Sequence, residues 1–82
     1  MAPKKTTRPP LMRISGAAQA AGVSRQTVEY YCMLGLVRPI RPPGRAGRFF
    51  DAKLVNRIQL IHRLNKSGYT LRDIRETYLK NR

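Results

Sequence analysis

The pattern of apolar and polar residues is clearest in residues 24–34, where it predicts an amphipathic helix. Ser24 can accept a hydrogen bond from the free backbone N–H groups of the first turn, and Gly35 can adopt the left-handed conformation that ends a helix. The apolar face consists of Val28, Tyr31 and Leu34, with Thr27 beside them. The opposite face carries Arg25, Gln26, Glu29 and Tyr30. One face can therefore pack against a core while the other stays available for a ligand.

A pair of helices is predicted in the second half of the chain. Asp51 is the expected N-cap of a helix from about Ala52 to Lys66, which Ser67 and Gly68 end. Its apolar stripe at helical spacing consists of Leu54, Val55, Ile58, Ile61 and Leu64. His62 lies off this stripe, so we expect it on the surface.

The segment that begins at Thr70 predicts the second helix of this pair. Thr70-Leu71-Arg72-Asp73 is close to a capping box, with Asp in the position of the usual Glu. Leu71, Ile74 and Tyr78 would share one face of the helix that follows.

Residues 11–22 predict a brief strand and then a helix of small residues. Leu11 to Ile14 form a short, largely apolar segment, and Ser15 is the predicted N-cap of a helix from Gly16 to Ala21. Small side chains let another helix approach closely, so three alanines are expected to be buried, namely Ala17, Ala20 and Ala21. Because Gly22-Val23 leads directly into the next helix, the two helices form a helix-turn-helix.

Residues 36–50 predict a small β-hairpin around a loop rich in proline and glycine. Pro39 has no N–H to donate, which restricts the first strand to an edge or a very short pairing. The hairpin carries four arginines and no acidic residue: Arg38, Arg41, Arg45 and Arg48. Such a hairpin beside a helix-turn-helix is a wing, and we expect at least two of its arginines to contact phosphate. The predicted fold is therefore mainly α with a small β-hairpin, a winged helix-turn-helix followed by a helix pair.

Composition indicates a polyanionic partner. The 82 residues contain 17 Lys and Arg against 4 Asp and Glu, which gives a formal charge of +13 and a pI near 11.4. Nucleic acid is favoured over a membrane, because the sequence has no long apolar run. Residues 1–10 combine three positive charges with three prolines, so we expect a disordered tail. This tail either aids solubility or is a basic arm that follows the phosphate backbone or enters the minor groove. Residues 11–82 form a single domain.

The sequence does not indicate enzyme activity or metal binding. With one cysteine, Cys32, and one histidine, His62, neither a disulfide within the chain nor a Cys/His metal cluster can form. Four scattered carboxylates do not provide a clustered acid, base and nucleophile. We therefore expect no enzyme activity, no metal and no cofactor, a cytoplasmic, nucleoid-associated location, and a Cys32 that is a small surface or partly buried residue.

Several segments together resemble the DNA-binding domain of MerR-family transcriptional regulators. The resemblance covers Met12 to Glu76 and rests, in chain order, on Ile14-Ser15, Ala20-Ala21-Gly22-Val23-Ser24, Thr27-Val28, Tyr30-Tyr31, Leu34-Gly35-Leu36-Val37, Gly47-Arg48-Phe49-Phe50-Asp51, Ile61-His62-Arg63-Leu64 and Ser67-Gly68-Tyr69-Thr70-Leu71-Arg72-Asp73-Ile74. It implies that the helix of residues 24–34 enters the major groove and that the wing of residues 38–50 lies on the phosphate backbone or in the flanking minor groove. It also implies that dimers bind pseudopalindromic sites and distort them.

The resemblance assigns DNA contacts to six residues, which are Ser24, Arg25, Gln26, Thr27, Tyr30 and Arg48. Side-chain chemistry agrees, since Arg can pair with guanine and Gln with adenine, whereas a tyrosine hydroxyl suits phosphate. Two residues depart from the family pattern: Glu29 stands where a basic residue is usual, and Cys32 where an acid is usual. Glu29 can accept a hydrogen bond from cytosine N4 or can orient Arg25 one turn earlier, and the sequence leaves both roles open.

The sequence also bears on how the chain assembles and on which other functions it could have. MerR-family regulators continue into a dimerisation helix and an effector domain, whereas this sequence stops at Arg82. We therefore expect double-stranded DNA as the partner and a monomer for this chain, with dimers possible on DNA or through a further C-terminal region. Two alternatives remain, a basic RNA-binding module and a basic protein-interaction adaptor. The adaptor would use an exposed apolar patch of Tyr69, Tyr78 and Leu79.

Overall fold

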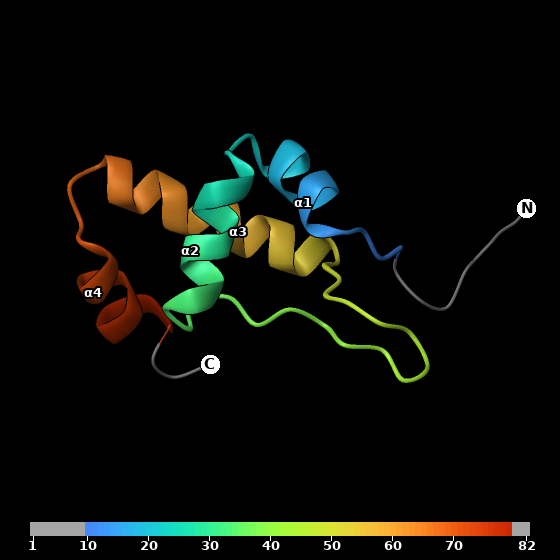
Figure 1. Cartoon of the computed structure of the whole chain (residues 1–82). Coiled ribbons are helices and arrows are strands. Elements are labelled where there is room, and N and C mark those ends of the chain that lie inside the picture. The colour runs from blue at the N-terminus through green and yellow to red at the C-terminus, as the bar shows by residue number, and fades with distance from the viewer. Residues whose placement is uncertain (1–9, 80–82) are drawn as a thin grey trace, which may run out of the picture.

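Helices account for most of the structure, a computed structural model that describes residues 10–79, with only the backbone at positions 78 and 79. The predicted tail, apart from Pro10, and the predicted roles of the Tyr78 and Leu79 side chains lie outside the described residues. The helices are α1 (Ile14–Ala21), α2 (Arg25–Met33), α3 (Ala52–Lys66) and α4 (Leu71–Ile74), which continues into the π-helical turn η1 (Arg75–Leu79). Helix α3 contacts α1 and α4, and α2 lies across it with α1 alongside (Figure 1). None of the described helices is long and apolar enough to cross a membrane.

The predicted caps of three helices are confirmed. The side chain of Ser24 accepts a hydrogen bond from the backbone N–H of Thr27 at 3.0 Å, and Asp51 accepts one from Leu54 at 3.0 Å. Thr70 and Asp73 form the reciprocal bonds of a capping box. Each of these bonds joins residues three positions apart, so the local sequence is sufficient to specify them.

The start of α1 differs from the prediction. The helix begins at Ile14, with Arg13 as its N-cap, and Ser15 lies within the first turn rather than capping it. The physical reason is that Ile14 is needed in the core, where its side chain is only 8% exposed. The burial of Ala20 was also predicted wrongly: Ala20 is exposed, and Ala18 is buried in its place with Ala17 and Ala21.

Strand structure is smaller than predicted. The hairpin is reduced to one antiparallel bridge between Ile40 and Phe49, and the strand expected over residues 11–14 is reduced to one bridge between Met12 and Phe50. Pro39 precedes Ile40 and cannot donate to a ladder, which explains why the pairing does not extend through it. The segment between the bridged residues projects from the helices as the wing (Figure 1).

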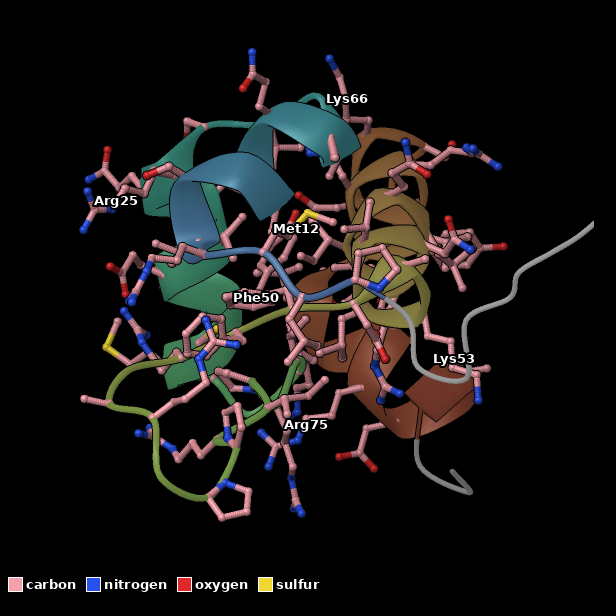
Figure 2. The ribbon with its side chains drawn as sticks, turned by 90° about the vertical axis from the view of Figure 1, so that its right-hand side faces the viewer. Met12, Arg25, Phe50, Lys53, Lys66 and Arg75 are labelled. Carbon is pink, nitrogen blue, oxygen red and sulfur yellow. The ribbon has the colours of Figure 1, made fainter. Side chains whose placement is uncertain are left out.

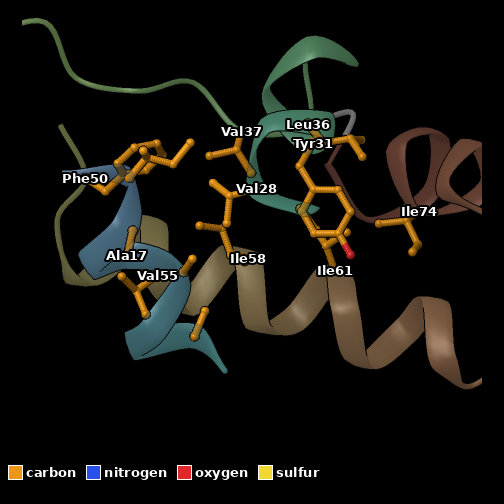
Figure 3. Packing of buried hydrophobic residues seen from close by; sticks show 13 residues of the cluster. Ala17, Val28, Tyr31, Leu36, Val37, Phe50, Val55, Ile58, Ile61 and Ile74 are labelled. Carbon is orange, nitrogen blue, oxygen red and sulfur yellow. The ribbon is translucent and has the colours of Figure 1, made fainter. Parts of the chain in front are cut away.

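The core lies between α2 and α3 and is closed at its two ends by α1 and α4. Figure 3 shows Val28 and Tyr31 of α2 facing Ile58 and Ile61 of α3, with Ile74 of α4 pointing toward Tyr31. The stripe predicted for α3 is confirmed at its centre, since Val55, Ile58 and Ile61 are buried, whereas Leu54 and Leu64 are partly exposed. One face of α2 is therefore held against the body of the protein.

The wing is also held to the helices through its base. Leu36, Val37, Phe49 and Phe50 are all buried. The guanidinium of Arg57 in α3 donates a hydrogen bond of 2.9 Å to the backbone carbonyl of Leu36. The wing therefore has a defined position relative to α2.

Candidate nucleic-acid interface

The first turn of α2 presents two long polar side chains to solvent. Ser24 and Thr27 are hydrogen-bonded to each other through their hydroxyl groups, at 2.9 Å, which holds the start of the helix in place. Arg25 and Gln26 lie between them and are exposed, and the Arg25 side chain is 63% exposed. In Figure 2, Arg25 lies on the opposite side of the molecule from Lys53. Because the other face of α2 is buried, these side chains have a fixed base from which to reach a ligand.

Tyr30 extends this surface along α2. It is 47% exposed, in contrast to its neighbour Tyr31, which is 3% exposed. Tyr30 lines a groove of about 390 Å³ with Gln26, Thr27 and His62. His62, which was expected on the surface, is half-buried in this groove rather than fully exposed.

Glu29 joins α2 to the wing. Its Oε1 accepts a hydrogen bond from Nη2 of Arg48 at 3.0 Å, and its Oε2 lies 3.8 Å from Nε of Arg25. The side chains of Arg48 and Glu29 are 30% and 39% exposed. The contact with Arg25 fits one of the two roles considered from the sequence, in which Glu29 orients Arg25. The shorter contact with Arg48 was not foreseen, because 19 positions separate the two residues.

The arginines of the wing differ in their surroundings. Arg38, Arg41 and Arg45 are exposed, whereas Arg48 is half-buried beside Glu29. Among residues 10–79, both ion pairs found involve Glu29. The exposed arginines of the wing therefore have no carboxylate partner in the described part of the chain.

Arg13 also reaches the wing, although no pattern in the sequence assigned it a role. The guanidinium carbon of Arg13 lies 4.7 Å from the centroid of the Phe49 ring, and that of Arg45 lies 4.2 Å from the same centroid. Phe49 and Arg13 are far apart in sequence and meet through the fold, so no local pattern could have revealed the contact.

Burial raises two pKa values next to this surface. Loss of solvent raises the pKa of the Tyr31 hydroxyl. Burial also raises the pKa of the Cys32 thiol, which positively charged Arg48 partly opposes and Glu29 reinforces. Both groups are therefore neutral near pH 7, and the half-buried Cys32 agrees with its expected place. No cluster of three or more potential metal ligands occurs among the described residues.

Comparison with known proteins identifies the family. The profile of the "MerR HTH family regulatory protein" matches residues 12–80. The chain belongs to the MerR family. Among MerR-family relatives, it is 32% identical over 62 residues to the mercuric resistance operon regulatory protein of Bacillus cereus, covering 76% of this chain and 47% of that protein. It is 38% identical over 64 residues to the HTH-type transcriptional regulator CueR of Bacillus subtilis (strain 168), covering 78% of this chain and 44% of CueR.

A solved MerR-family structure has a similar fold. The crystal structure of HiNmlR, described as a MerR family regulator lacking the sensor domain and bound to promoter DNA, superposes with a TM-score of 0.74 at 25% identity. The match covers 82% of this chain and 51% of the HiNmlR chain. This chain therefore spans about half the length of the relatives it matches. The winged helix-turn-helix fold predicted from the sequence is confirmed.

Proposed function

We propose that this chain binds double-stranded DNA as the DNA-binding part of a transcriptional regulator. The observation that carries the proposal is the exposed pair Arg25 and Gln26 on the first turn of α2, a helix whose opposite face is buried. A rigid helix with long polar side chains at its N-terminal end is the geometry by which a helix-turn-helix protein inserts into the major groove. The names of the relatives, which describe regulators, and the promoter DNA bound to HiNmlR support the same function.

Base recognition would fall to the first turn of α2. Arg25 can donate two hydrogen bonds to guanine, and Gln26 can pair with adenine. Ser24 and Thr27 bond to each other, so we assign them the shaping of the turn together with contacts to the nearby backbone. Tyr30, half-exposed one turn later, would donate its hydroxyl to a phosphate.

Phosphate contacts would come from the wing. Arg38, Arg41 and Arg45 are exposed and without carboxylate partners in the described residues, so each can neutralise a phosphate. Arg48 would lie beside the backbone, where Glu29 competes with phosphate for its guanidinium. This contact favours an orienting role for Glu29 over recognition of cytosine.

We propose that the chain binds DNA without catalysing a reaction and that it does so at the nucleoid. One copy of the chain would occupy each half-site. Among the described residues, the large exposed apolar side chains are Tyr30 and Met33 on α2, Leu60 on α3 and Tyr69 before α4, so they are divided among three segments. A lasting interface usually buries more than about 1,000 Å². We therefore propose that the 82-residue chain is a monomer in solution, which analytical ultracentrifugation at micromolar concentration would test.

Selection of bound sequences from a random duplex library tests the proposal. A recurring motif is expected, and Arg25→Ala and Gln26→Ala should each cost roughly 1–3 kcal/mol of discrimination at one base position. Lys53→Ala, on the opposite side of the molecule, is the control and should leave the selected motif unchanged. If no motif emerges, or if structured RNA competes better than duplex DNA, sequence-specific DNA binding is wrong.

A further inference from the structure

Two arginines from separate parts of the fold meet on one aromatic ring at the base of the wing. Arg13 precedes α1, Arg45 belongs to the wing loop, and both guanidinium groups lie over the ring of Phe49. Phe49 itself is only 2% exposed although it lies outside the core cluster, so the two guanidinium groups help to cover its ring. The two positive charges are consequently held within roughly 9 Å of each other, about one Debye length at physiological salt.

The backbone of the wing leaves room for this arrangement. Gly47 has a φ of 104°, and a Cβ at that position would lie 2.9 Å from Nη1 of Arg13. Any larger residue at position 47 would therefore displace the Arg13 guanidinium as well as strain the backbone. The observed position of the Arg13 guanidinium therefore fits a glycine at position 47.

The stacked guanidinium groups keep their hydrogen-bonding capacity. Stacking uses the face of the guanidinium, whereas its five N–H donors lie in the plane of the group and point outward. Among the described residues, no hydrogen bond from the side chain of Arg13 or Arg45 to protein is found, and neither forms an ion pair. Two adjacent cations with free donors and no counter-charge form a site for an anion with several oxygens, and a phosphodiester has that chemistry.

The position of Arg13 makes a purely structural role a poor explanation. Arg13 is the N-cap of α1, but its side chain makes no capping hydrogen bond. Ser, Thr, Asp or Asn would satisfy the free N–H groups there, and a positive charge is unfavourable at the positive end of the helix dipole. The cap position therefore does not explain an arginine at residue 13, whose side chain contacts Phe49 instead.

We propose that Arg13 and Arg45, held on the ring of Phe49, form a phosphodiester-binding pair at the base of the wing. Arg13 is then a contact to the DNA backbone that comes from the residue before α1, in addition to those of α2 and the wing. This inference rests on the proposed binding of double-stranded DNA.

The test is the salt dependence of binding to one selected duplex, measured between 50 and 200 mM salt. Loss of one phosphate contact flattens the slope of log K against log salt by about 0.9, which is about 3.5-fold in affinity over this range. Arg13→Gln and Arg45→Gln should each show this change. Lys53→Gln removes the same charge from a residue that lies on the opposite side of the molecule from Arg25 (Figure 2), and it should keep the slope of the unmodified protein. Arg13→Lys keeps the charge and should also keep the slope.

The outcomes separate this inference from the function on which it rests. If the unmodified protein binds the duplex and Arg13→Gln has the same salt slope as Lys53→Gln, the phosphate site is wrong while DNA binding stands. If Arg13→Lys flattens the slope as much as Arg13→Gln, Arg13 shapes the wing instead of neutralising a phosphate, and the inference is again overturned. If the unmodified protein fails to bind duplex DNA at any salt concentration, the proposed function itself is wrong. A melting temperature for each variant establishes that it is folded when it is measured.

Discussion

Glu29→Gln removes the carboxylate that joins α2 to the wing, and its effects on stability and on DNA binding should have opposite signs. The bond from Arg48 to Glu29 is 3.0 Å long, and the two side chains are 30% and 39% exposed, so solvent screens the pair only in part. Such a pair contributes up to about 1 kcal/mol. The 3.8 Å contact with Arg25 adds a few tenths at most, since Arg25 is 63% exposed and precedes Glu29 by four residues, the less favourable order. The variant should therefore lose about 1 kcal/mol of stability, or about 5 °C in melting temperature.

DNA binding should become stronger in the same variant. Glu29 is a negative charge on the side of α2 that we assign to DNA, and it competes with phosphate for Arg48. The neutral amide no longer holds Arg48 by its charge, so one more phosphate can be neutralised. The slope of log K against log salt should steepen by about 0.9, and affinity at low salt should rise for every duplex alike.

Fluorescence anisotropy with two duplexes of different sequence, together with thermal unfolding, measures both effects. Glu76→Gln changes the net charge equally and is the control, because Glu76 lies on η1 and forms no ion pair with the described residues. An unchanged salt slope would refute the competition with phosphate for Arg48, and a loss of discrimination at a G·C pair other than the one that Arg25→Ala affects would refute the orienting role. That result would show instead that Glu29 accepts a hydrogen bond from cytosine.

Four further variants test the fold. Ser24→Ala should destabilise the protein by about 1 kcal/mol in urea unfolding, because the N–H of Thr27 loses its cap, and no change would show that the cap is dispensable. Ala17→Leu should cost about 1–3 kcal/mol because Ala17 is fully buried, whereas Ala20→Leu at an exposed position should be nearly neutral, and equal effects would contradict the placement of α1. Burial raises the pKa of Cys32, so folding favours the neutral thiol. The resulting contribution to the free energy of unfolding is complete below the ordinary thiol pKa, and it is lost as the pH rises through the raised pKa of the folded protein. Cys32→Ser should therefore show a smaller fall in melting temperature between pH 8 and 10 than the unmodified protein, and iodoacetamide should react with native Cys32 more slowly than with the unfolded chain.

Local sequence determined the helices and the polar face of α2. The caps at Ser24 and Asp51 and the capping box at Thr70 depend on residues within one turn, and the buried stripes follow from helical spacing. The excess of basic over acidic residues by itself indicates a polyanionic partner, because net charge does not depend on the fold. These features need no knowledge of distant residues, so they could be predicted.

Only the tertiary structure decided how the wing is fixed and what surrounds its charges. The bond from Arg48 to Glu29 joins residues 19 positions apart, and Arg13 meets Phe49 across most of the helix-turn-helix. The start of α1 was also set by packing, because burial of Ile14 outweighed the capping preference of Ser15. Neither the bond between Arg48 and Glu29 nor the contact between Arg13 and Phe49 leaves a periodic signal in the sequence, since each depends on where the fold brings two separate segments together. The sequence gives the sign of each charged residue, but the fold determines which residue lies beside it.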